Sequence, residues 1–231
     1  MSDSALREVE REARLEAAPF AVLVAVALAV LSLVSLRADW RLLDGIGWWL
    51  WLAAAAPWAV LAVTLRTGLR RVPGRDMRQG IVRGLLVVVV AATLVQTGIL
   101  VASLVSSDDL GISGPQLLQS GATLWLSNVV AFGLAFWELD CGGPVERALS
   151  DRRHAPDFGF PQDDNPDLAR PDWSPHLVDY LYLSTTNSIA FSPTDVMPLT
   201  RPAKAFMTVE SAVSVIAVLL IAARAINILQ A

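Results

Sequence analysis

Residues 18–36 read APFAVLVAVALAVLSLVSL and contain no charged side chain. A helix that crosses the hydrocarbon core of a bilayer needs about 20 predominantly apolar residues. A helix of a water-soluble protein would carry an apolar stripe and a polar back face, and this stretch has no polar face. It is too long for the apolar core of a signal peptide and is not followed by a small-residue cleavage pattern. The stretch therefore predicts a retained membrane-spanning helix.

Four more stretches have the same character, at residues 46–65, 81–105, 117–139 and 205–229. Across the chain, 54% of the residues are hydrophobic and 17% are charged, and the apolar residues come in long blocks. These features predict an all-α fold, an integral membrane helical bundle of five transmembrane helices, and they argue against a soluble enzyme. Glu210 and Arg224 interrupt the last stretch, so we expect both to face protein or water.

Two further features flank the first stretches. Residues 1–17 alternate Arg and Glu, which predicts a charged, solvated or interface-lying helix ahead of a three-helix transmembrane region at residues 18–106. Tryptophans gather just before and within the early part of the second stretch, and indole rings favour the headgroup region. We therefore expect these side chains to anchor the bundle at the membrane interface. They are Trp40, Trp48, Trp49, Trp51 and Trp58.

The placement of arginine predicts the orientation. The loop after the second stretch is rich in arginine, whereas the loop after the third carries Asp108 and Asp109 and no basic residue. By the positive-inside rule the arginine loop is cytoplasmic, which also places the amino terminus and the end of the fourth stretch inside. We therefore expect a multi-pass protein of a cell inner membrane. The arginines of this loop are Arg66, Arg70, Arg71, Arg75 and Arg78.

The sequence contains no recognisable motif for catalysis or for binding a cofactor. Cys141 is the only cysteine, so neither a disulfide within the chain nor the usual cysteine-based metal site is expected. His154 and His176 lie outside the apolar stretches, which argues against a haem ligated inside the bilayer. Ser184, Asp179 and His176 fall close together, and we interpret them as helix-capping and loop residues. We expect no enzyme activity, no catalytic residue, no metal or other cofactor, and no nucleic-acid partner.

The chain becomes polar after the fourth stretch. The composition of residues 140–175 predicts an acidic, proline-rich surface loop. Residues 176–190 mix apolar positions with polar ones, among them Thr185, Thr186 and Asn187, and predict a helix too short and too polar to span a bilayer. Such a helix can belong to a re-entrant hairpin or can lie on the membrane surface, and the residue pattern leaves both open.

From Tyr182 to Ile228 the chain resembles the pore helix, filter and inner helix of the tetrameric potassium-channel superfamily. Members of that superfamily carry Thr-Val-Gly-Tyr-Gly-Asp, then two residues and Pro. The matching residues here are Ala190, Phe191, Ser192, Pro193, Thr194 and Asp195, then Val196, Met197 and Pro198. The resemblance implies a pore-like module at residues 107–231 that assembles as a homotetramer in the lipid bilayer. The whole chain is also similar to uncharacterised bacterial multi-pass membrane families.

Within this module the resemblance assigns an outer helix to residues 117–139 and a re-entrant pore-like helix to residues 176–190. A filter-like loop at residues 191–198 and an inner helix at residues 205–229 follow. In such a tetramer we expect Glu210 to bond back to the pore-like helix, through Thr185 or Thr186, and Arg224 to reach the headgroups. The two side chains lie about 21 Å apart along one helix, too far to pair with each other.

The filter-like loop departs from the potassium-channel pattern. Ser192, Pro193 and Thr194 stand where Gly, Tyr and Gly would be, and a stacked-carbonyl filter needs conformations that glycine adopts more readily than other residues. The loop therefore predicts weak selectivity or none. A ring of Asp195 carboxylates with the hydroxyls of Ser192 and Thr194 would suit hydrated monovalent or divalent cations, which the acidic loop would concentrate. Asp195 can equally be a turn or capping residue.

Three functions remain open from the sequence. The first is the pore-forming subunit of a tetrameric cation channel with a degenerate filter, and the second is a non-conducting scaffold or accessory subunit that keeps the same fold. The third, a small-solute transporter, is disfavoured because no inverted repeat is visible. The orientation is a difficulty for the first, since a potassium-channel pore loop enters from outside and the arginine loop predicts that this hairpin enters from inside. Otherwise, residues 176–196 would have to cross the membrane.

Overall fold

The computed structural model describes residues 3–37, 47–68, 75–106, 114–149, 155–165, 167, 169–170, 173–190 and 195–230. In chain order the elements are α1 (Asp3–Arg37), α2 (Trp49–Thr67), α3 (Arg75–Ser106), α4 (Gly114–Leu139), the 3₁₀ turn η1 (Asp140–Gly142), α5 (Pro144–Leu149), β1 (Phe158–Gly159), α6 (Pro161–Asp164), α7 (Leu177–Ala190), β2 (Met197–Pro198) and α8 (Arg201–Gln230). The described chain is almost entirely helical, which confirms the predicted all-α class.

Five of these helices are long and apolar enough to cross a membrane, as the sequence predicts. The qualifying segments are Leu6–Arg37, Trp49–Thr67, Asp76–Ala102, Leu117–Gly142 and Arg201–Leu219. The first of them begins about three turns before the predicted start, because α1 continues through its charged residues.

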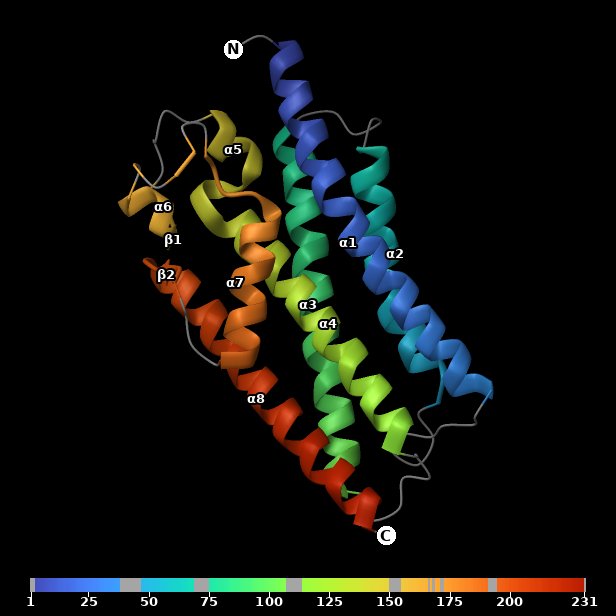
Figure 1. Ribbon diagram of the computed structural model, residues 1–231. Helices are drawn as coiled ribbons and strands as arrows, with labels where there is room; N and C mark the ends of the chain where they lie inside the picture. Colours follow the sequence, from blue (N-terminus) through green and yellow to red (C-terminus); the bar gives the residue numbers. More distant parts are fainter. Residues whose placement is uncertain are drawn as a thin grey trace.

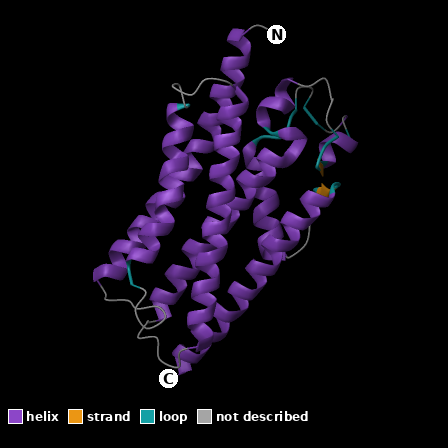
Figure 2. Cartoon of the chain, turned by 180° about the vertical axis from the view of Figure 1, so that it is seen from behind, coloured by secondary structure: helices purple, strands orange, loops and turns teal. Residues whose placement is uncertain are grey.

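The first four helices run alternately up and down (Figure 1). The start of α1, the end of α2, the start of α3 and the end of α4 therefore lie at one end of the bundle, which we call the N-terminal end. The short elements α5, α6, β1 and β2 lie toward this same end, and α8 finishes at the opposite end. Seen from behind, the strands form one small patch on an otherwise helical chain (Figure 2).

The charged segment at residues 1–17 is not a separate helix. It forms the first turns of α1, which continues without a break through Pro19 into the apolar stretch. Ion pairs help to hold it against the bundle, since Glu10 Oε2 lies 3.7 Å from Arg14 Nη1 and 3.3 Å from Arg78 Nη2 of α3. The charged turns therefore belong to the bundle, with Ala17 already buried.

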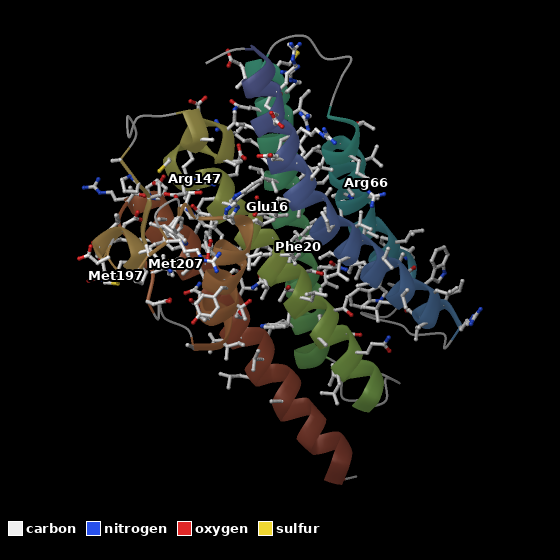
Figure 3. The ribbon with its side chains drawn as sticks, turned by 45° about the horizontal axis from the view of Figure 1, so that its top comes forward. Glu16, Phe20, Arg66, Arg147, Met197 and Met207 are labelled. Atoms are coloured by element: carbon white, nitrogen blue, oxygen red, sulfur yellow. The ribbon has the colours of Figure 1, made fainter. Side chains whose placement is uncertain are left out.

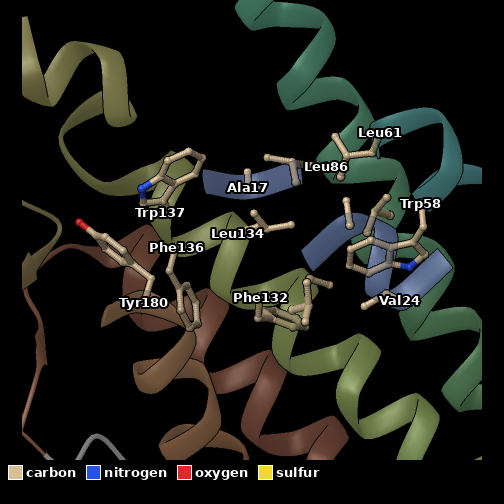
Figure 4. Close-up of a cluster of buried hydrophobic side chains, with 14 of the residues drawn as sticks. Ala17, Val24, Trp58, Leu61, Leu86, Phe132, Leu134, Phe136, Trp137 and Tyr180 are labelled. Atoms are coloured by element: carbon tan, nitrogen blue, oxygen red, sulfur yellow. The ribbon is translucent and has the colours of Figure 1, made fainter. Parts of the chain in front are cut away.

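Two of the tryptophans predicted to be interfacial anchors are core residues instead. Trp51 and Trp58 are each 1% exposed, and Trp58 packs beside Val24 of α1 (Figure 4). They point inward because they lie seven residues apart on one face of α2, the face against α1. Trp48 and Trp49, at the start of α2, are exposed and remain candidates for the anchoring role. Trp40 lies outside the described residues.

The helix α7 packs against α4 and α8 and is much shorter than either. At 1.5 Å per residue its 14 residues measure about 21 Å, against about 39 Å for the 26 residues of α4. It starts beside the end of α4 and descends roughly halfway along the bundle (Figure 1). The chain then returns, because Phe158 pairs with Pro198 and Gly159 with Met197 in an antiparallel β1–β2 pair. His176, which precedes α7, and Val196, which precedes β2, therefore lie toward the same end of the bundle.

Two predicted loops contain regular structure. The region at residues 140–175 holds η1, α5, β1 and α6, and the last two residues predicted for the filter-like loop form β2. The helix α8 begins at Arg201, four residues before the predicted start, because Thr200 Oγ1 accepts a hydrogen bond of 3.4 Å from the Ala203 amide and Pro202 suits the first turn.

Gly133 is a point of close approach between α4 and α7. A Cβ added there would lie 2.7 Å from Leu181 Cδ2 and 3.2 Å from Leu181 Cα. Gly133→Val should therefore push α7 outward and lower the free energy of unfolding by about 1–3 kcal/mol, the usual cost of overpacking. Gly98→Val is the matched control, because a Cβ added at this residue of α3 would have no described atom within 4 Å. Equal unfolding midpoints of the two variants in mild detergent would contradict this packing.

Candidate functional site

One seam of α8 faces the rest of the bundle. Ala203, Met207, Glu210 and Ser214 are all buried, and their spacing of four, three and four residues follows one face of a helix that packs against neighbours. Two of the four positions are polar, which is uncommon and costly inside a membrane bundle unless both groups are hydrogen-bonded. The seam therefore marks the place where polar chemistry is concentrated.

Glu210 is fully buried, and its two carboxylate oxygens accept hydrogen bonds from two residues of α7. Ser184 Oγ donates to Oε1, and Asn187 Nδ2 donates to Oε2 at 2.6 Å. Ser184 Oγ also lies 2.9 Å from the Val129 carbonyl oxygen of α4. The carboxylate thus joins α8 to α7 directly, and Ser184 extends the contact to α4.

Asn187 makes further contacts with α8 on both sides of Glu210. Its Nδ2 lies 3.0 Å from the Met207 carbonyl oxygen, and its Oδ1 accepts a hydrogen bond of 2.9 Å from Ser211 Oγ. Both polar atoms of the Asn187 side chain are therefore used in contacts with α8. This fixes the depth at which α7 sits along α8, because a shift by one turn would break all of these bonds together.

Two more polar contacts continue the network toward the middle of the bundle. Trp125 Nε1 of α4 donates to Ser188 Oγ of α7 at 3.1 Å, and Asn128 Nδ2 donates to Ser214 Oγ of α8 at 3.0 Å. Asn128 Oδ1 is buried without a hydrogen-bond partner among the described residues. Asn128, Ser214 and Thr97 of α3 line a cavity of about 30 Å³, which is large enough for one water molecule.

A second polar cluster holds the N-terminal end of the hairpin. The buried carboxylate of Asp140, at the end of α4, accepts a hydrogen bond of 2.5 Å from the Tyr180 hydroxyl and one of 2.8 Å from the Asp157 amide. Asp157 Oδ1 in turn accepts a hydrogen bond of 2.5 Å from Thr200 Oγ1, the cap of α8. One acidic residue therefore links α4, α7 and the segment that leads into β1, and through Asp157 it reaches the start of α8.

Arg147 of α5 closes this cluster (Figure 3). Its guanidinium lies 3.7 Å from Asp140 Oδ2, donates to the Trp137 carbonyl at 3.1 Å, and sits 5.1 Å from the centre of the Tyr180 ring. Burial raises the pKa of Tyr180, so the phenol remains a proton donor to Asp140 at any ordinary pH. The Phe158 ring packs edge-on against Tyr180 and covers the cluster from the other side.

The start of α7 is capped from two directions. Asp179 Oδ2 accepts a hydrogen bond of 2.8 Å from the His176 amide, the local cap predicted from the sequence. Glu16 Oε1 of α1 accepts one of 2.6 Å from the Leu177 amide (Figure 3). Because a helix amino terminus carries partial positive charge, both carboxylates are favourably placed. The charged part of α1 therefore helps to position α7, a role that the sequence of α1 does not indicate.

The structure places the predicted site residues unevenly. Glu210 does bond to α7, but through Ser184 and Asn187 and within one chain, so the predicted partners Thr185 and Thr186 are wrong. Their hydroxyls bond to the Leu181 and Leu183 carbonyls of their own helix instead. Ala190 ends α7.

Several filter-like residues cannot be compared with the prediction. Phe191, Ser192, Pro193 and Thr194 lie outside the described residues, as does the side chain of Arg224. Asp195 is described and is exposed, as both of its predicted roles allow.

The sequence interpretation misses Ser184, Asp140 and Tyr180. It treats Ser184 as a capping or loop residue, although its spacing of three from Asn187 puts both on one face of α7. A polar face on this short helix, followed in the chain by an apolar helix with one acidic residue, is the sequence feature that could have identified Ser184. Asp140 gives none, because an acidic residue at the end of a span ordinarily faces solvent. The described residues include no group of three or more His, Cys, Asp and Glu side chains that could hold a metal ion.

Comparison with protein-family models, with curated proteins and with solved structures finds no match to this chain. The potassium-channel resemblance therefore rests on the residues quoted above, and any function drawn from it is a proposal.

Replacing Glu210 tests the network directly. Glu210→Leu leaves the Asn187 amide without one of its buried acceptors and should lower the free energy of unfolding by about 1–2 kcal/mol, the upper range for hydrogen bonds between membrane helices. Glu210→Gln keeps one acceptor and should cost less. Thr208→Val is the matched control, since this exposed hydroxyl bonds only to its own helix at Lys204. Unfolding midpoints in mild detergent measure the effect, and a Glu210→Leu variant as stable as the control would contradict the bracing role.

Proposed function

We propose that this protein is the pore-forming subunit of a homotetrameric, channel-like membrane protein that passes cations with weak selectivity. Its five apolar helices would cross a cell inner membrane, and α4, α7 and α8 would act as outer, pore-like and inner helices. The non-conducting scaffold with the same fold is the alternative.

The observation that carries the proposal is the path of the chain between α4 and α8. A half-length helix descends beside α4, and the chain returns through β2 to the end from which it came before α8 begins. Backbone that does not cross a bilayer can enter it only where it is buried in protein or lines water. The network around Glu210 supplies such burial on the side of α7 that faces α4 and α8. This order and depth of elements is what the resemblance to a channel pore predicts.

The ends of the bundle bear on orientation. The chain has 18 Lys and Arg residues, and most of them belong to segments at the N-terminal end. The exceptions are Arg37, Arg41 and Arg224. The positive-inside rule therefore favours a cytoplasmic N-terminal end, with the hairpin entering from the cytoplasm. This is opposite to the potassium-channel orientation, and it is part of the proposal.

Two observations favour the alternative. The polar bonds that hold α7 in place close within one chain, so the hairpin does not need a second copy to be braced. Exposed Arg201 and Lys204 also stand at the start of α8, a few residues from Asp195, and would oppose cation entry. A scaffold that has kept the fold without conducting would show the same features.

Cation flux into proteoliposomes tests conduction. We expect a leak that discriminates little between Na⁺ and K⁺, and that Asp195→Ala reduces by up to about tenfold at low ionic strength, because charge at a pore mouth raises the local cation concentration. Added salt should shrink the difference between the variants. Glu8→Ala is the matched control, an exposed acid of α1 outside both the filter-like loop and the acidic loop. Reconstituted protein that conducts nothing at any voltage or pH would instead support the scaffold.

Side-specific thiol labelling tests the orientation. Cys141 itself is only partly exposed and touches Asp140, so a Cys141→Ser background with new exposed cysteines is preferable. Glu8→Cys and Asp164→Cys report on the N-terminal end, and Trp48→Cys on the opposite end. We expect an impermeant maleimide to reach Trp48→Cys on intact cells and the other two only after permeabilisation. The reverse pattern would mean a potassium-channel orientation, and opposite results for Glu8→Cys and Asp164→Cys would contradict the arrangement of spans.

A further inference from the structure

A groove of about 430 Å³ opens on the outer surface between α3, α4 and α8. Its long wall is one face of α3, from Arg83 through Val87 and Val90 to Leu94, and its floor includes Ala135 of α4. Phe206 of α8 forms part of the opposite wall. Apart from the charged pair at one end the lining is almost entirely apolar.

The length of the groove matches one leaflet of a bilayer. Arg83 and Leu94 are eleven residues apart on a helix, which corresponds to about 16 Å. One leaflet contributes half of a hydrocarbon core of about 30 Å. The groove closes beyond Leu94, where Thr97 of α3 and Ser214 of α8 line the same small cavity. It is therefore a blind trough that begins near the N-terminal end and stops at mid-bundle.

The open end of the trough is polar. Arg83 Nε donates to Glu138 Oε1 at 2.9 Å, and Arg83 Nη2 donates to the Gly142 carbonyl at 2.5 Å. The Arg83 side chain is nevertheless 46% exposed. A guanidinium has five N–H donors, and these contacts use two of them, which leaves donors on the outer side of Arg83 for an anion.

We propose that this groove is a binding site for one phospholipid. One acyl chain lies along α3 from Arg83 to Leu94, and the phosphate accepts hydrogen bonds from the outer donors of Arg83. The Glu138 contact holds the guanidinium at the mouth of the trough, so its charge is directed at the headgroup. A lipid bound in this groove would contact both α3 and Phe206 in the first turns of α8, where those two helices diverge.

The shape of the groove favours an acyl chain over a helix from a second copy. A helix with its side chains is about 10–12 Å across, and a helix crossing the bilayer would continue past Leu94, where α3 and α8 come together. An acyl chain that ends at mid-bilayer and is attached to an anionic headgroup fits both the width and the length of the groove. This inference rests on the membrane-spanning arrangement proposed above and is independent of whether the protein conducts.

The test reconstitutes the protein into vesicles of phosphatidylglycerol and phosphatidylethanolamine and then extracts it into mild detergent. Native mass spectrometry counts the phospholipids that remain bound to each chain. Val87→Trp fills the groove from a side chain that is 67% exposed, and Val88→Trp is the matched control, 49% exposed on the same helix but outside the groove. Arg83→Gln removes the headgroup contact, with Arg66→Gln, an exposed arginine of α2, as its control.

We expect the unchanged protein and both controls to retain about one phospholipid per chain, and Val87→Trp to retain none. Arg83→Gln should raise the dissociation constant about tenfold, the effect of losing one hydrogen bond to a charged group. Equal retention in Val87→Trp and Val88→Trp would overturn the proposal, as would a similar loss in all four variants, which would indicate general surface lipid. An oligomer that contains no bound phospholipid and dissociates in Val87→Trp alone would overturn it in favour of a second copy. None of these outcomes depends on ion flux, so failure here leaves the flux result to be judged separately.

Discussion

The constraint on which the C-terminal half depends is the burial of the Glu210 carboxylate in the middle of an apolar helix. Neither lipid nor an apolar side chain can hydrogen-bond such a group, so protein donors have to reach it. Ser184 and Asn187 do so from α7, and Ser184 continues to the Val129 carbonyl of α4. A half-polar helix that could lie on a membrane surface is thereby held between two long helices at one depth.

The other end of the same hairpin is held by Asp140, which plays a matching role with a different set of partners. It accepts hydrogen bonds from the Tyr180 hydroxyl and from the segment that leads into β1, and β1 pairs with β2 just before α8. The two carboxylates therefore fix α7 at its start and along its lower half. Gly133 allows the close approach between α4 and α7 that both sets of bonds require.

The N-terminal helices contribute more than a membrane anchor. Glu16 of α1 caps α7, and Arg83 of α3 pairs with Glu138 of α4. The first three helices are thus connected to the C-terminal half of the chain by charged contacts at the N-terminal end, where most of the basic residues also belong. The Arg83 side chain in this contact is 46% exposed, so it can pair there at small desolvation cost.

The sequence by itself determined the all-α class, the five apolar helices and a short polar helix before the last one, because these follow from the length and periodicity of apolar runs. It also indicated that Glu210 would face protein or water, since an isolated acid in an apolar helix needs a partner, and the resemblance to a channel pore implied that this partner lies on the short helix. Only the tertiary structure decided which side chains serve. Ser184 rather than Thr185 faces α8, Trp51 and Trp58 face the core, and Asp140 is buried. Those outcomes depend on how α7 is rotated and how deeply it sits between α4 and α8, and on which face of α2 meets α1. Contacts between distant parts of the chain set both, and no local pattern encodes them.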